Sequence, residues 1–118
     1  MDMVIRVARD DGRVVAERVV SGDDVRIMSA AVLWLATCGG CGHCVGVDVC
    51  GLAVYLGQRA ALHVGMMQVS RREALVTAVA LRRWASACAV TGDCAEGLAC
   101  LLCGCIDADP APFSPIYG

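Results

Sequence analysis

Hydrophobic residues, many of them β-branched, fill two runs near the start of the chain, and a polar segment separates these runs. The runs are residues 3–8 and 13–20, and the segment between them contains Asp10, Asp11 and Gly12. An Asp-Gly pair between two such runs is a strong hairpin signal, because Gly adopts the positive φ that a tight turn requires. The pattern therefore predicts an N-terminal β-hairpin.

After the hairpin, hydrophobic positions recur with the period of an α-helix. A helix is expected to begin in residues 21–24, where Asp23 and Asp24 lie near the positive end of the helix dipole. Its apolar positions are Val25, Met28, Val32 and Leu35. The helix should end near Thr37, because a glycine-rich segment follows.

The rest of the chain is expected to form a short strand and three more helices. The predicted order is a strand at 44–48, a helix from Val49 to about Ala61, a helix from Ser70 to about Ala87, and a helix that begins at 91–93. Ser70 and Glu73 have the spacing of a capping box, in which each side chain accepts a hydrogen bond from the other residue's backbone amide. The helix behind this box has a broad apolar surface, so we expect it to be mostly buried.

Length and composition indicate one globular domain. The chain has 118 residues, of which 58% are hydrophobic, and its formal net charge is −2, so it has no basic footprint for nucleic acid. The elements predict an α/β (α+β) domain in residues 1–106, with the hairpin and a short third strand packed on four to five helices. All three prolines lie in residues 107–118, which we expect to form an extended tail.

The sequence also bears on compartment and membrane. Residues 1–6 include the charged Asp2 and Arg6 and lack the apolar run of a signal peptide. Without an export signal, we expect a reducing compartment, cytoplasmic or nuclear. The longest stretch without a charged residue is 27–47, but only residues 30–36 of it are continuously apolar. A membrane span needs about 20 predominantly apolar residues. We therefore expect no membrane partner.

Several segments resemble the BTB/POZ fold in its smallest form, that of the Skp-type adaptors and elongin C. Residues 5–15 are similar to the family's strand-turn-strand I-K-L-x-S-S-D-G-x-x-F, and residues 24–28 to its helix segment T-I-K-x-M-L. Residues 44–47 stand where the family has the strand V-P-L-P, and 69–84 where it has the buried helix V-D-x-x-x-L-x-E-L-x-x-A-A-N-Y-L. The likeness covers about residues 3–104.

The resemblance implies an adaptor without catalytic activity, or a mimic of such an adaptor. Such adaptors join the cullin scaffold of a ubiquitin ligase to a substrate receptor, of the F-box or BC-box type, and use one face for each partner. The family's cullin-contacting A-A-N-Y-L segment is Ala-Leu-Arg-Arg-Trp here, so two arginines replace an amide and a phenol. Arg and Trp are enriched at interface hot spots. The candidate partner-binding residues are Tyr55, Gln58, Arg59, Arg82, Arg83 and Trp84. The alternative is that Trp84 packs in the core and both arginines are solvated.

Nine cysteines leave a metal site open as an alternative to an adaptor with no metal or cofactor. Cys38, Cys41, Cys44 and Cys50 have a spacing that suits zinc or an iron–sulfur cluster, and His43 is able to replace one thiolate. Inert thiols in a loop and the core are the other interpretation of this group. A second group consists of Cys94, Cys100, Cys103 and Cys105. Two interpretations of this group are open, packing in the core and binding of a metal ion.

The sequence contains no pattern that predicts an enzyme. It has no Ser/His/Asp set, no phosphate-binding glycine loop and no paired carboxylates in an apolar setting. A dithiol redox role for Cys41 and Cys44 lacks the strand–helix context of thioredoxin. A helical module that associates with copies of itself, as a homodimer or larger oligomer, is a further alternative to the adaptor.

Overall fold

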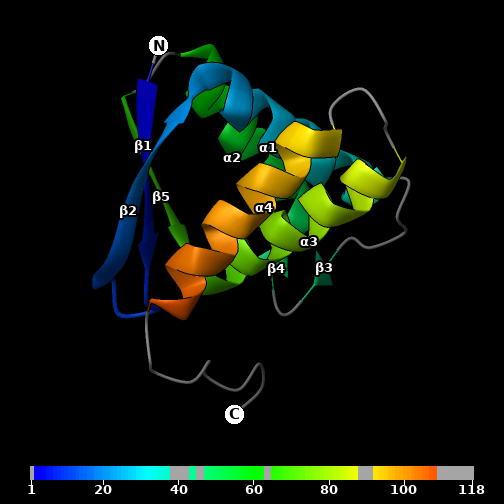
Figure 1. The fold of residues 1–118 in the computed structure, drawn as a ribbon. Coiled ribbons are helices and arrows are strands. Elements are labelled where there is room, and N and C mark those ends of the chain that lie inside the picture. The colour runs from blue at the N-terminus through cyan, green and yellow to red at the C-terminus, as the bar shows by residue number, and fades with distance from the viewer. Residues whose placement is uncertain (1, 38–42, 45–46, 63–64, 88–91, 109–118) are drawn as a thin grey trace.

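In the computed structural model, residues 2–37, 43–44, 47–62, 65–87 and 92–108 are described. They form a three-stranded sheet with helices packed against one of its faces (Figure 1). The elements in chain order are β1 (Asp2–Ala8), β2 (Val14–Ser21), α1 (Gly22–Thr37), β3 (His43–Cys44), β4 (Val47–Asp48), α2 (Val49–Ala61), β5 (Met66–Ser70), α3 (Arg71–Ala87) and α4 (Gly92–Asp107). The predicted α+β class is confirmed.

The predicted N-terminal hairpin is present. β1 and β2 pair antiparallel, from Asp2 opposite Ser21 to Ala8 opposite Val14. In the turn, Gly12 has a φ of 89°, and its N–H donates to the Arg9 carbonyl at 2.8 Å. The positive φ explains why glycine occupies this position.

The third strand of the sheet is β5, which pairs parallel to β1, so that the strand order is β2-β1-β5. β5 was not predicted from the sequence, and the single strand predicted at 44–48 is corrected to two short strands. His43–Cys44 and Val47–Asp48 pair with each other in a separate two-stranded ladder instead of joining the sheet. The sequence signal for β5 is weak, because its alternation of buried and exposed positions includes only two buried residues, Met67 and Val69.

The helices form two packed pairs, α1 with α2 and α3 with α4, and α3 also packs on α1. The predicted capping box begins α3: Ser70 Oγ accepts from the Glu73 N–H at 3.0 Å, and Glu73 Oε1 accepts from the Ser70 N–H at 2.8 Å. Seven residues of α3 are buried, as expected for a helix with neighbours on several sides. α3 therefore lies in the middle of the helical layer.

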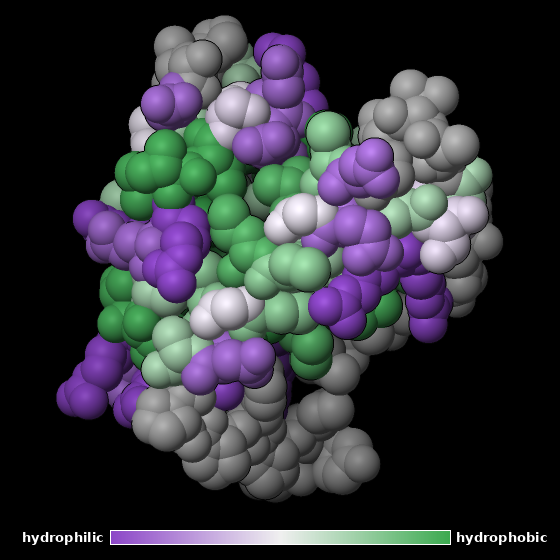
Figure 2. Space-filling view, in the orientation of Figure 1, coloured by the Kyte–Doolittle hydropathy of each residue, from purple (hydrophilic) through white to green (hydrophobic). Residues whose placement is uncertain are grey.

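The core lies between the sheet and these helices. The four apolar positions predicted for α1 are all buried, and so are Ala95, Leu98, Ala99 and Leu102 of α4. α4 also contacts β2, and Figure 2 shows hydrophobic residues gathered along the junction of these two elements. None of the helices in the described ranges has the length and apolar character needed to cross a membrane.

Candidate functional site

The outward face of α2 is unusually apolar for a surface helix. Val54 is 57% exposed and Leu62, which follows the last residue of α2, is 72% exposed. Gln58 lies between them at intervals of four residues, so the three side chains share one face. Cys50 and Ala61 are exposed on the same face. We call these five residues, Cys50, Val54, Gln58, Ala61 and Leu62, the α2 face.

The opposite side of α2 fixes the direction of this face. Leu52, Ala53, Leu56 and Ala60 are buried there. Ser29 Oγ of α1 donates to the Ala53 carbonyl at 2.9 Å. Ser29 Oγ would lie 3.1 Å from a Cβ at Gly57, so the two helices approach closely at this point. The tight α1–α2 contact leaves the α2 face directed to solvent.

Tyr55 connects the α2 face to the sheet. Its hydroxyl accepts a hydrogen bond from the Gln68 N–H of β5 at 3.2 Å. The guanidinium carbon of Arg59 lies 5.0 Å from the centre of the tyrosine ring, which is cation–π geometry. Tyr55 is half-buried and held from two directions, so its side chain has little conformational freedom.

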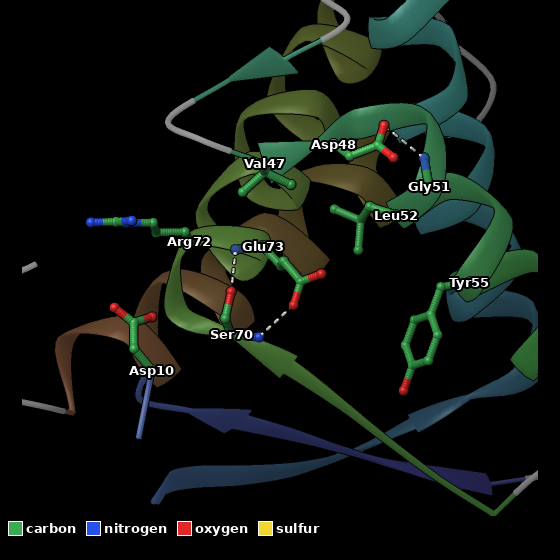
Figure 3. A pocket seen from close by; sticks show the side chains of 9 residues that line it. All are labelled: Asp10, Val47, Asp48, Gly51, Leu52, Tyr55, Ser70, Arg72 and Glu73. Carbon is green, nitrogen blue, oxygen red and sulfur yellow. Dashed lines mark hydrogen bonds between the residues drawn. The ribbon is translucent and has the colours of Figure 1, made fainter. Parts of the chain in front are cut away.

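A pocket of about 440 Å³ opens beside Tyr55 (Figure 3). It lies between the starts of α2 and α3, with Tyr55 and Arg72 at opposite ends. Its lining consists of Asp10, Val47, Asp48, Gly51, Leu52, Tyr55, Ser70, Arg72 and Glu73. A second hollow of about 340 Å³ shares Asp10, Ser70 and Glu73 with it and continues past Gln68. We call these two adjoining hollows, which lie beside the C-terminal ends of β1 and β5, the groove.

Three polar residues of this groove, Asp48, Ser70 and Glu73, cap helices. An Asp48 carboxylate oxygen accepts from the Gly51 N–H at 3.2 Å, and a Cβ at Gly51 would come within 2.6 Å of the other Asp48 oxygen. Ser70 and Glu73 are engaged in the capping box of α3. These hydrogen bonds stabilise the starts of α2 and α3, the two helices that border the groove.

The remaining candidate residues lie at the other end of α3. Trp84 is half-buried and meets Trp34 of α1 edge-to-face, with ring centres 6.3 Å apart. Arg82 is exposed and its Nη2 donates to Cys103 Sγ at 3.6 Å, whereas Arg83 is exposed to solvent. Trp84 follows Glu73 by eleven residues, which is about 16 Å along a helix. The six predicted residues therefore form two separate groups, one on α2 and one at the end of α3.

The cysteines are distributed over several places. Cys38 and Cys41 lie outside the described residues, and only the backbones of His43 and Cys44 are described. On α4, Cys94 and Cys100 are exposed, Cys103 is half-buried and Cys105 is buried. Within the described ranges, no three His, Cys, Asp or Glu side chains converge to hold a metal ion.

Burial raises the pKa of the Cys105 thiol above its ordinary value of 9.0, while the positive charge of Arg18 acts in the opposite direction. The thiol therefore loses its proton at lower pH in the unfolded chain than in the folded one. Cys105 stabilises the fold below about pH 9, and this contribution is lost as the pH rises through the folded pKa.

We expect the free energy of unfolding to fall as the pH rises above about 9, and to fall less steeply in Cys105→Ala. Urea unfolding at several pH values measures both slopes. Cys94→Ala removes an exposed thiol from the same helix and should keep the slope of the unmodified chain. Equal slopes for the unmodified chain and Cys105→Ala would contradict the assignment.

No family model, curated protein or solved structure matches this chain. Its function therefore has to be inferred from its own surface. Sequence reasoning identified Tyr55, Gln58 and Arg59 but missed Val54 and Leu62. The spacing of Val54, Gln58 and Leu62 was visible in the sequence, but apolar residues at helical spacing usually mark the core face.

Proposed function

We propose that this protein is a non-enzymatic adaptor that binds other proteins and links a cullin-type ubiquitin-ligase scaffold to an F-box or BC-box type substrate receptor. The observation that supports this proposal most strongly is the α2 face. Surface helices normally direct polar side chains to solvent. Here two large apolar side chains, Val54 and Leu62, are more than half exposed. Another side of the same helix, at Gly51, Leu52 and Tyr55, lines the open groove. A partner protein that covers them would remove that area from water.

The anchoring of Tyr55 adds to this argument. Binding costs free energy when side chains must be ordered at the interface. Tyr55 is already held by the Gln68 N–H and lies under the Arg59 guanidinium. Tyrosine and arginine are also enriched among residues that contribute most to binding. The α2 face is thus bordered by side chains that lose little freedom on docking.

The architecture also supports an adaptor. The BTB/POZ resemblance requires a pleated N-terminal hairpin and a buried helix behind Ser70, and this chain has both. A protein that links two partners needs two separate surfaces. The α2 face is one, and the exposed Arg82 and Arg83 at the far end of α3 provide the second.

The test is capture of purified cullin and receptor proteins by the immobilised chain. Val54→Glu should weaken capture of one partner at least about tenfold, because a buried valine contributes about 1.5 kcal/mol or more and a tenfold change corresponds to about 1.4 kcal/mol. Val19→Glu is the matched control. Val19 is 63% exposed on β2, so this variant introduces the same charge at a similarly exposed site away from α2.

Three outcomes would contradict the proposal. The first is that neither partner class is captured, and the second is that Val19→Glu weakens capture as much as Val54→Glu does. The third is that the unmodified chain binds only copies of itself, which would establish an oligomerisation module instead. Urea unfolding of both variants shows whether each one folds, so loss of capture is not confused with loss of structure.

A further inference from the structure

The outward side of α4 contains a pair of cysteines that the adaptor proposal does not use. Cys100 and Cys103 are three residues apart, so their side chains are neighbours on the helix surface. Cys100 is exposed and Cys103 is half-buried. Apart from adjacent residues and the nearby backbone of α4 itself, no described atom lies within 4 Å of a Cβ placed at Gly97 or Gly104, so the described residues leave space beside the pair. Figure 2 shows small, weakly coloured residues along the side of α4 that faces the viewer.

A positive charge from the neighbouring helix lies against this pair. Arg82 of α3 directs Nη2 at Cys103 Sγ, at 3.6 Å. A guanidinium is always protonated at physiological pH, and it has N–H donors but no acceptor. The guanidinium therefore places a fixed positive charge beside Cys103 Sγ, where it would offset the negative charge of a metal–thiolate complex.

The spacing of the pair favours a bridging atom over a disulfide. Side chains three residues apart on a helix have their Cβ atoms about 5–6 Å apart. A disulfide requires Cβ atoms about 3.5–4.5 Å apart, so closing one would distort the helix. A metal ion adds two metal–sulfur bonds of about 2.3 Å each, judged from zinc sites, and spans the wider gap without that distortion.

The number of ligands selects the kind of metal. Zinc in structural sites takes four protein ligands. No group of three or more His, Cys, Asp or Glu converges anywhere in the described residues, the surroundings of Cys100 and Cys103 included. Two thiolates satisfy a soft monovalent cation, and Cu(I) is the common biological example of a metal that thiolates select.

We propose that Cys100 and Cys103 form a two-thiolate site for Cu(I). On binding, two S–H bonds break and their protons pass to solvent, two Cu–S bonds form, and copper stays in its +1 state. The resulting bis-thiolate complex has a charge of −1, which the Arg82 guanidinium beside Cys103 offsets. Arg82 is thus a positioning residue for the metal site.

The experiment adds Cu(I) anaerobically to the full chain and maps which cysteines resist alkylation by N-ethylmaleimide. Cleavage after Glu96 and Asp107 releases one peptide that contains Cys100, Cys103 and Cys105, and mass spectrometry locates the modified sulfurs. Cys100 and Cys103 should become protected together, while the exposed Cys94 is alkylated at its metal-free rate. Copper is added up to several equivalents, so that binding at Cys38, Cys41 and Cys44 cannot hide the site.

Variants separate the metal site from other causes of protection. Cys103→Ser should restore alkylation of Cys100 in the presence of Cu(I), whereas Cys94→Ser should leave the protection unchanged. Arg82→Gln should weaken Cu(I) affinity about tenfold or more in competition with a coloured Cu(I) chelator, as for other residues that support metal ligands. The proposal is overturned if excess Cu(I) leaves Cys100 and Cys103 at their metal-free rates, or if Cys100 stays protected in Cys103→Ser.

Discussion

Leu81→Ala is expected to lower the free energy of unfolding by about 3 kcal/mol, within the range of about 2–5 kcal/mol for such changes. Leu81 lies on α3, which packs against both α1 and α4, and its side chain is fully buried. The substitution removes three buried carbon atoms and leaves a cavity that three packed elements cannot readily fill. Urea unfolding monitored by far-UV circular dichroism measures the loss.

Leu33→Ala provides the matched control for this prediction. Leu33 lies on α1 but is 50% exposed, so its truncation should change stability by no more than about 0.5 kcal/mol. A similar loss in both variants would show that α3 is not the buried centre of the helical layer. The same result would contradict the adaptor proposal, because that proposal requires α3 to be the central buried helix.

Trp84→Ala is expected to cost about 2 kcal/mol of folding stability, below the 3–5 kcal/mol typical of fully buried aromatic residues because Trp84 is half-buried. Its ring meets the edge of Trp34 at an interplanar angle of 89° and joins the end of α3 to α1. A double-mutant cycle with Trp34→Ala should give a coupling of about 0.5–1.5 kcal/mol, the range for aromatic pairs. Chemical unfolding of the four proteins provides the measurement.

Arg83→Ala tests the other interpretation of the same segment. Arg83 is adjacent to Trp84 but exposed, so its removal should leave stability within about 0.5 kcal/mol and affect only partner capture. If Trp84→Ala kept full stability and lost capture instead, Trp84 would be an interface residue and not part of the packing between α1 and α3.

The helices and the hairpin were predictable because their signals are local. The capping box at Ser70 and Glu73 specifies the start of α3, and Asp-Gly specifies the turn between β1 and β2. β5, which pairs with the other edge of β1, was not predictable from such a local signal. β5 has five residues and pairs with a strand about 60 positions earlier, so its position depends on tertiary packing and not on a periodic pattern.

The candidate site was predicted in part for a similar reason. Tyr55 and Arg59 were identifiable by residue type, since aromatic and basic side chains are common at interfaces. The exposure of Val54 and Leu62 depends on how α2 rotates against α1, and hydrophobicity does not specify that rotation. The cysteines of α4 show the same limit: core packing was one expectation for all four, but only Cys105 is fully buried.

β1 lies in the middle of the sheet, so during part of translation it has only one of its two partner strands. The last residue of β2 and the first residue of β5 are about 45 positions apart, and a ribosome adds about 5–20 residues per second. For several seconds, β1 of the nascent chain is therefore paired with β2 on one edge only, because β5 has not yet been synthesised. An unpaired strand edge is a template for pairing with a strand of another chain, which leads to aggregation. A growing chain of this protein is thus most exposed to aggregation while α1 and α2 are being synthesised.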